Sequence, residues 1–313
     1  MEHIFLVQPK EETMDVSNVN RSKSARKNSL LLQDGVFEVE FFGYSFSLLG
    51  VEKKVYVKAP MVLQNCGKRT ISLSVEELNL VSSALRNTFI SSFRSERFSL
   101  FDISFRTAGL SSSIGFNFND IMDFYYIEPE QIFKPFENYG VGFISNVIKK
   151  LQASMFQYPP GYNPVFMFGL VISGSADLEC VKGFIRYDPA EAPTALDRAS
   201  IIERIAKPIN PKGSGAKLFT DVANELECIG FEFAFVGVDC YINGSVRIKL
   251  YFRCYGKYDL NETVEKISSM ISQFGLSGRV EDCFSQHHSG IWGIALSTDL
   301  FEDVNRVQLY FYP

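Results

Sequence analysis

Five pairs of short segments along the chain alternate between apolar and polar residues. The clearest is SVRIKLYFRCY, residues 245–255, in which Ile248, Leu250 and Phe252 share one face of a strand. Asn243-Gly244 directly precedes it and is the strongest dipeptide signal for a tight hairpin turn. Alternation of this kind predicts antiparallel strands with one apolar and one polar face.

The hairpins recur at a nearly constant interval. They begin at residues 36, 98, 165, 230 and 290, so the intervals are 62, 67, 65 and 60 residues. Amphipathic segments fill the gaps and predict helices over 74–93, 140–155, 192–206, 217–230 and 261–275. Gly230 and Gly275 suit the residue that follows a helix end. The repeat predicts one architecture used five times.

The fold class that follows is α/β of the α+β type, with a closed antiparallel β-barrel of about ten strands in five hairpins ringed by outer helices. Closure is favoured because ten antiparallel strands in an open sheet would leave long exposed edges. Residues 1–34 include SNVNRSKSARKNS, which is polar, basic and aperiodic, and predict a flexible N-terminal arm. Residues 35–313 are then a single barrel domain.

Helices outside such a barrel cover the apolar strand faces, so the polar faces line the interior. Phe residues fill many of the opposite positions, and the second strands of most hairpins carry cations. The uncharged inner-face residues are Tyr56, Ser104, Asn117, Phe184, Tyr251, Gln308, Tyr310 and Tyr312. The charged ones are nine cations, Lys54, Lys58, Arg106, Lys182, Arg186, Arg247, Lys249, Arg253 and Arg306, and four anions, Glu38, Glu40, Asp102 and Glu232.

The inner face therefore carries a surplus of five positive charges in a chain whose net charge is −5. Burying one unpaired cation costs several kcal/mol, so the surplus predicts water and a bound polyanion. Aromatic faces stabilise a nearby cation by about 0.5–2 kcal/mol, which suits a diphosphate whose organic part becomes positive. The alternative is that these charged faces are solvated outer faces of the sheet.

Several classes of protein are disfavoured by the sequence. It has no apolar run of 18 residues and no secretory signal, and its net acidity argues against non-specific nucleic-acid binding. Six cysteines without a C-x-x-C pair indicate reduced thiols in a cytoplasmic protein. Only three histidines are present, which disfavours a histidine metal site, and SQHHSG, with His287, predicts a polar loop.

Three stretches resemble the ABBA prenyltransferases, and among them the cyanobactin prenyltransferase family, which attaches isoprenyl groups to peptides. The stretches are FENYGVG at 136–142, VFMFGLVISGSADLECVKGFIRYDP at 165–189, and IGFEFAF with NGSVRIKLYF between 229 and 252. The resemblance covers residues 136–297 and extends more weakly from 98. It implies a soluble, Mg²⁺-dependent transfer of a dimethylallyl or geranyl group from its diphosphate to a linear or macrocyclic peptide, or to a small aromatic acceptor.

The resemblance also implies roles for individual residues. Tyr251 and Tyr310 would flank the allylic cation, with Tyr312 and Phe184 as further shielding rings. Glu232, Tyr56 and Asn117 lie on the acceptor side of this scheme. The diphosphate would be held by Lys182, Arg186, Lys249, Arg253 and Arg306, with Arg106 and Arg247 on the same inner faces.

Asp102, in SLFDISFRT, corresponds to the carboxylate on the family's first barrel strand, where the family usually has Glu. It is a candidate for the base that takes the acceptor's proton or for a carboxylate near Mg²⁺. A salt bridge to Arg106 is the structural alternative. The hairpin at 36–59 would take the place of a missing C-terminal hairpin in a permuted closure, which makes Glu38 and Glu40 reserve candidates for the base.

Two other classes of function remain open at this point. One is a non-catalytic binding protein on the same barrel. The other is a single-stranded nucleic-acid binder, because basic and aromatic residues interleaved on strands also form stacking platforms. Binding to a nucleic-acid phosphate backbone weakens steeply as the salt concentration rises, so salt dependence distinguishes the nucleic-acid binder from the other binding protein.

Overall fold

The structure is a computed structural model. The predicted N-terminal arm and the helix predicted at 74–93 lie outside the residues that it describes. Those residues are 36–58, 70–72, 98–106, 113–120, 133, 136, 144–155, 165–173, 177–186, 200–206, 215–255, 258–287, 290–299 and 304–313.

All five predicted hairpins are confirmed. Each pairs two antiparallel strands that are consecutive in the described chain. A further short strand, β3 (Thr70–Ser72), pairs with the start of β1 and was not predicted. The hairpin strands are β1 (Val36–Ser47), β2 (Gly50–Lys58), β4 (Phe98–Arg106), β5 (Ile114–Asp120), β6 (Val165–Ile172), β7 (Leu178–Arg186), β8 (Phe231–Tyr241), β9 (Val246–Cys254), β10 (Ile291–Asp299) and β11 (Val304–Phe311).

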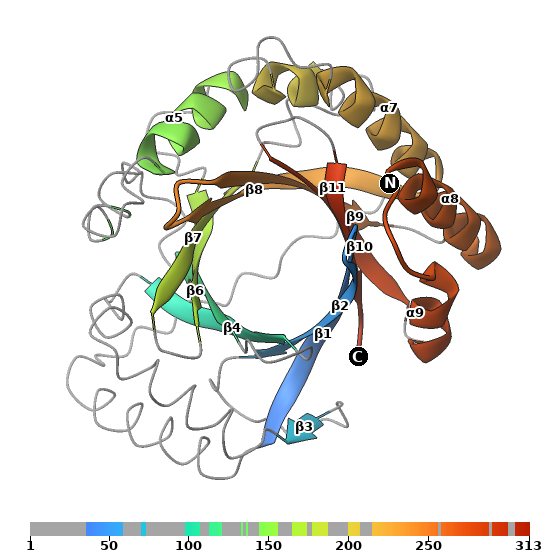
Figure 1. The fold of residues 1–313 in the computed structure, drawn as a ribbon, viewed down its shortest axis with the longest axis horizontal. Helices are drawn as coiled ribbons and strands as arrows, with labels where there is room; N and C mark the ends of the chain where they lie inside the picture. The colour runs from blue at the N-terminus through green and yellow to red at the C-terminus, as the bar shows by residue number, and fades with distance from the viewer. Residues whose placement is uncertain are drawn as a thin grey trace, which may run out of the picture.

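The strands close into a barrel because the first hairpin pairs with the last. In this seam β1 runs antiparallel to β11, and Gly43 lies opposite Tyr310. The other hairpins follow one another around the ring, as Figure 1 shows in a view along the barrel. The seam removes the two long edges that an open sheet would expose. The predicted closed antiparallel barrel is therefore confirmed.

Helices lie outside the ring of strands (Figure 1). They are α5 (Ile144–Met155), a helical stretch at 200–206, α7 (Gly215–Cys228), α8 (Leu260–Gln273) and α9 (Val280–Gln286). The Asp259 carboxylate caps α8 by accepting the Glu262 backbone N–H at 2.9 Å. Gly230 and Gly275 adopt positive φ just after α7 and α8, as the sequence predicts. Among the described helices, none has the length and apolar character needed to cross a membrane.

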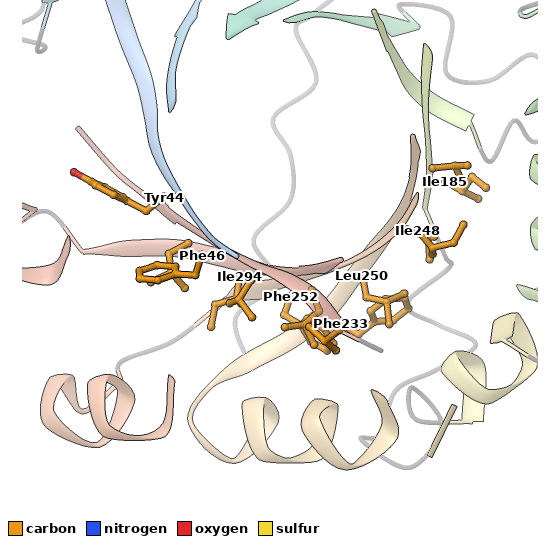
Figure 2. Close-up of a cluster of buried hydrophobic side chains, with 14 of the residues drawn as sticks. Tyr44, Phe46, Ile185, Phe233, Ile248, Leu250, Phe252 and Ile294 are labelled. Carbon is orange, nitrogen blue, oxygen red and sulfur yellow. The ribbon is translucent and has the colours of Figure 1, made fainter. Parts of the chain in front are cut away.

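The apolar strand faces point outward and form the core with these helices. Phe46, Phe233 and Phe252 are fully buried in this layer, together with aliphatic residues of neighbouring strands. Figure 2 shows these side chains on the side of the strands that faces the helices. Their burial leaves the alternate residues of each strand on the barrel interior.

Register shifts interrupt the described strand pairings at seven places that the sequence pattern does not mark, and those in β1, β8 and β10 change which residues line the inner face of the barrel. In β1 the pairing shifts between Val39 and Phe41, so that Val39 belongs to the outer core while Phe41 contacts inner rings. Half-buried Glu40 is the extra residue of this bulge. The inner positions that follow are Phe41, Gly43 and Ser45, which the sequence analysis did not assign. Similar shifts occur in β8 at 233–235 and in β10 at 291–293.

The prediction of a polar loop at SQHHSG is wrong for His287. This side chain is buried, and its ring stacks on Phe311 with centroids 5.0 Å apart. Its Nε2 atom lies 2.7 Å from the hydroxyl oxygen of Tyr44, which also donates to Gln286 at 3.0 Å. The histidine thus joins the end of α9 to the seam between β1 and β11, a tertiary contact that local polarity does not reveal.

The layer between strands and helices should dominate stability. We expect Phe46→Ala to lower the free energy of unfolding by about 3–5 kcal/mol, because Phe46 is fully buried and its truncation leaves a cavity. Leu49, at the turn of the same hairpin, is fully exposed, so Leu49→Ala should change it by less than about 0.5 kcal/mol. Urea unfolding measures both. Equal effects would contradict the assignment of the outer faces to the core.

Candidate functional site

The barrel interior has two distinct ends. Because each hairpin runs up one strand and down the next, all five hairpin turns lie at one end, which we call the turn end. The opposite end, where the chain leaves each hairpin for the next, is the helix end. Along the inner face of β9, Arg247 lies toward the turn end, Lys249 and Tyr251 follow, and Arg253 lies toward the helix end.

Four predicted cations come together toward the turn end and are called here the cation cluster: Lys182, Arg247, Lys249 and Arg306. The strand register brings them together. Lys182 and Arg247 lie on either side of Asp239, and Lys249 and Arg306 lie on either side of Ser297. Three strands, β7, β9 and β11, therefore direct four cations at one part of the interior.

Carboxylates that the sequence analysis did not count accompany these cations. Asp239 Oδ2 lies 2.6 Å from Lys249 Nζ, and both side chains are almost fully buried. Asp299 Oδ1 lies 3.7 Å from Arg247 Nε, and Glu52 Oε2 lies 3.7 Å from Arg306 Nη1. With these three, the predicted surplus of five positive charges falls to two. The correction was within reach of the sequence, because the turn at Asn243-Gly244 sets Asp239 opposite Arg247.

The buried pair of Asp239 and Lys249 is strongly perturbed. Burial alone would raise the pKa of Asp239, but Lys249, Lys182 and Arg247 together outweigh it and hold this pKa at about 2. Burial lowers the pKa of Lys249 to about 8, and repulsion from Lys182 and Arg247 acts in the same direction, against the attraction of Asp239. Both groups are charged at neutral pH, and Lys249 loses its proton within the mildly alkaline range.

Several polar atoms of this region have no hydrogen-bond partner within the described part of the chain. They are the hydroxyls of Ser45 and Ser297, Oε1 of Gln308 and Oδ1 of Asp239, all buried. Buried polar atoms are almost always satisfied, so water or a polar ligand is expected to contact them. The side chains of Arg247 and Arg306 keep 19% and 20% of their surface exposed, which indicates that solvent reaches the interior.

A group of rings, which we call the aromatic layer, lies next to the cation cluster. It consists of Phe184, Tyr251 and Tyr310, all buried, with Tyr56 and Phe235 packed against them. Phe235 stacks on Tyr251 with centroids 4.3 Å apart, and Tyr310 lies 6.1 Å from Tyr251 and 5.8 Å from Tyr56. Burial raises the pKa of Tyr310 well above its ordinary value, so it remains a neutral phenol.

Glycines on the inner face leave room for these rings. A Cβ atom on Gly237 would lie 2.9 Å from Cε2 of Tyr251, and one on Gly43 would lie 2.9 Å from Cε2 of Tyr56. Both contacts are too short for a side chain of any other residue. The position of the aromatic layer therefore depends on glycine in β1 and β8.

Beyond the aromatic layer, the helix end carries Trp292, the chain's single tryptophan, which the sequence analysis did not select. The bulge in β10 brings its ring against inner residues, 5.8 Å from Tyr310 and 5.2 Å from Phe41. Arg253 lies here too, with its guanidinium carbon 5.5 Å from the Trp292 ring. A change of face at one bulge gives no periodic signal, which is why Phe41 and Trp292 were missed.

Among the described side chains, four predicted site residues lie apart from the cation cluster. Arg253, assigned to the diphosphate, lies at the opposite end of β9, and exposed Glu232 is its cross-strand neighbour. Tyr312 is 38% exposed and contacts Phe41 at the helix end, outside the aromatic layer. Arg186 pairs in register with Phe235 near the end of β7.

The remaining inner positions of the first two hairpins are defined mainly by register. Asn117 is buried opposite Gly169, and Lys54 lies opposite Gly43. The strand position of Asp102 pairs with those of Lys58 and Asn117, which is an inner position. The side chains of Glu38, Lys58, Asp102 and Arg106 lie outside the described residues.

The described side chains do not fit a metal site held by the protein. No group of three or more His, Cys, Asp or Glu residues comes together among them. The inner carboxylates Asp239, Asp299 and Glu52 each face a Lys or Arg partner. Mg²⁺ usually takes one or two carboxylates together with phosphate oxygens of a substrate, so a role for Asp102 toward Mg²⁺ stays a prediction.

No protein-family model and no curated protein matches this sequence. Solved structures do share its fold. AnaPT from Neosartorya fischeri aligns with a TM-score of 0.56 at 12% identity, over 88% of this chain and 78% of that one. The 6-dimethylallyltryptophan synthase from Micromonospora olivasterospora, in complex with DMASPP and Trp, aligns with a TM-score of 0.55 at 12% identity, over 89% and 81%.

The 5-dimethylallyl tryptophan synthase from Streptomyces coelicolor, also in complex with DMASPP and Trp, aligns with a TM-score of 0.52 at 13% identity. The alignment covers 88% of this chain and 78% of that one. At such low identity the likeness concerns the fold alone. The ABBA barrel expected from the resemblance is thereby confirmed as architecture. The chain has the closed, helix-covered antiparallel barrel of these dimethylallyltryptophan synthase structures.

Proposed function

We propose that the protein is a prenyltransferase that moves a dimethylallyl group from its diphosphate to an aromatic acceptor inside the barrel. The observation that carries the proposal is the cation cluster lying beside the aromatic layer in a closed barrel. Two of the solved structures with this fold are complexes with DMASPP and Trp. That combination supports the same pair of substrate classes here.

The proposed reaction begins when the allylic C–O bond breaks and the electron pair leaves with the diphosphate. Lys182, Arg247, Lys249 and Arg306 would stabilise this leaving group, because fixed cations act most strongly where negative charge develops. The carbocation that remains would be stabilised by the faces of Tyr251 and Tyr310. The acceptor then supplies the electron pair for the new bond and loses a proton to a base.

When the donor binds, cations of the cluster would exchange their carboxylate partners for the diphosphate. Without a ligand, Asp239, Asp299 and Glu52 offset the charges of three of the four cations. Lys182 makes no ion pair within the described residues, although its charge acts on Asp239 across the strand pair. It is therefore the cation most directly available to a phosphate. The carboxylates keep the free protein from carrying four uncompensated buried charges. An incoming diphosphate would draw the paired cations away from these carboxylates and toward itself.

Three finer assignments remain part of the proposal. The acceptor is a peptide side chain, as in cyanobactin prenylation, or a small aromatic compound; the exposed residues of the helix end, Glu232, Arg253 and Tyr312, would let a longer acceptor extend out of the barrel. The donor is dimethylallyl or geranyl diphosphate. The base is Asp102, whose strand position lies on the inner face, with Glu38 and Glu40 in reserve.

The cation cluster should bind a non-reactive donor analogue. We expect dimethylallyl thiolodiphosphate to bind the wild-type protein in isothermal titration calorimetry, and Lys182→Met to weaken it about 10- to 100-fold, as for loss of one charge-assisted contact. Arg253→Gln is the matched control, because Arg253 lies at the other end of β9, and should leave the affinity unchanged. Titrations with and without Mg²⁺ show whether the metal enters with the diphosphate.

The opposite pattern, with Arg253→Gln weakening the analogue and Lys182→Met leaving it unchanged, would contradict the placement of the donor. Binding of the analogue without any turnover of dimethylallyl diphosphate would favour the non-catalytic alternative.

Donor binding should also depend on pH through Lys249. Its pKa of about 8 lies below the ordinary value for lysine, so its charge is present below pH 8 and is lost above it. We therefore expect about tenfold weaker binding of the thiolodiphosphate at pH 9.5 than at pH 7.5. The charge-balanced variant Asp239→Asn/Lys249→Met should bind the thiolodiphosphate more weakly at both pH values and should not lose affinity between pH 7.5 and pH 9.5. A variant with the same pH profile as the wild-type protein would exclude Lys249 from the site.

Asp239 should compete with the diphosphate for Lys249. We expect Asp239→Asn to tighten binding of the thiolodiphosphate at least about fivefold in mildly acidic buffer, because the variant removes a buried negative charge beside the anion. The mildly acidic pH is needed because Asp239 raises the pKa of Lys249, so its loss lets Lys249 become neutral at lower pH. Glu232→Gln removes an exposed carboxylate at the other end of the barrel and should not change the affinity. Weaker binding by Asp239→Asn would mean that Asp239 instead positions Lys249 for the phosphate.

A further inference from the structure

Lys249 is a buried amine that the proposed reaction uses only as a positive charge. Its side chain is 7% exposed, and its Nζ atom lies 2.6 Å from Oδ2 of Asp239. Burial lowers the pKa of Lys249 to about 8, so a neutral amine is populated in mildly alkaline solution. A desolvated lysine beside other cations is the kind of amine that enzymes use as a nucleophile.

Lys249 also lies at the border between the cation cluster and the aromatic layer. It is two residues from Tyr251 on the inner face of β9, which places their Cα atoms about 7 Å apart. Its strand partner Gly237 lies directly against the rings of Tyr251 and Phe184. A donor with its diphosphate in the cation cluster and its allylic chain against Tyr251 therefore has its reacting carbon beside the Lys249 amine.

The other three cations of the cluster are poorer nucleophiles. Lys182 precedes Phe184 by two residues on the inner face of β7, but its side chain is only half-buried. Water therefore stays in contact with the Lys182 ammonium, whereas that of Lys249 is almost fully desolvated. The guanidinium groups of Arg247 and Arg306 keep their protons in proteins and offer no lone pair.

Building on the proposed function, we propose that Lys249 is a self-modification site, which a bound dimethylallyl donor alkylates when no acceptor is present. Lys249 first loses a proton to solvent. Its lone pair then forms an N–C bond at the allylic carbon, while the C–O bond breaks and its electron pair leaves with the diphosphate. The product is a secondary ammonium, which keeps its positive charge beside Asp239. The added C5H8 group occupies the aromatic layer and blocks the next donor, so an empty acceptor site leads to inactivation.

The groups that face Lys249 set the pH at which its amine is neutral. Asp239 raises the pKa of Lys249, Lys182 and Arg247 lower it, and a bound diphosphate would raise it as a second anion. Burial raises the pKa of Cys180 to about 12 and that of Tyr310 well above its usual value, so both stay neutral in mildly alkaline solution. The remaining titratable groups of the described strands around Lys249 are Tyr251 on β9, Tyr241 on β8 and Arg306 on β11.

Mass spectrometry of the full chain tests the proposal, after incubation with saturating dimethylallyl diphosphate, with and without Mg²⁺ and without any acceptor. Peptide mapping should find one C5H8 group on Lys249. It should form at least about tenfold faster at pH 9.5 than at pH 7, because the neutral amine is the reactant. An excess of the non-reactive thiolodiphosphate should suppress the modification.

Three variants separate this reaction from unspecific alkylation. Asp239→Asn should move the rise in rate to lower pH, because Asp239 raises the pKa of Lys249. The charge-balanced variant Asp239→Asn/Lys249→Met should stay unmodified. Lys266→Met changes an exposed lysine of α8 and is the control, which should react as the wild-type protein does.

Modification of Lys266 instead of Lys249, or modification of Lys249 that excess thiolodiphosphate does not suppress, would overturn the assignment. Calorimetric binding of the thiolodiphosphate without modification of Lys249 by the reactive donor at pH 9.5 would also overturn it, and would leave the proposed function standing. Failure of the thiolodiphosphate to bind at all would contradict the proposed function, and the self-modification with it.

Discussion

The side-chain alternation of ten closed strands is the constraint on which the rest of the structure depends. Helices outside the barrel take the apolar faces, so every second residue of each strand must point into an enclosed interior. In an open sheet those polar residues would meet bulk water. The register of the neighbouring strands β7 to β11 brings Lys182 and Arg306, which are far apart in the sequence, to one region with Arg247 and Lys249. Closure through the seam of β1 and β11 encloses that region.

The interior is charged at one end and aromatic in the middle and at the other end. The turn end gathers charge, and the barrel tolerates it because carboxylates such as Asp239 accompany the cations in the absence of a ligand. The middle and the helix end present rings, with Tyr251 and Tyr310 buried and Trp292 nearer the exterior. A molecule with an anionic head and an allylic tail matches this order, and an aromatic acceptor would approach from the side opposite the anion.

Much of the fold could be predicted because it depends on local periodicity. The period of two in segments such as 245–255, and the spacing of about 60 residues between hairpins, led to the closed barrel that the structure contains. The same parity placed Lys182, Arg247, Lys249 and Arg306 on the inner face. Parity fails at bulges, where one extra residue changes faces, so Phe41 and Trp292 were not found. It also says nothing about depth along the barrel, which is why Arg253 was grouped with Lys249 although the two lie toward opposite ends.

The central claim is that one end of the interior receives a diphosphate and the middle receives its allylic chain. A crystal structure of the complex with dimethylallyl thiolodiphosphate tests it most directly. The account predicts the diphosphate among Lys182, Arg247, Lys249 and Arg306, with the dimethylallyl group against Tyr251 and Tyr310. A ligand bound at the helix end beside Arg253, or on the outer surface of the barrel, would contradict it.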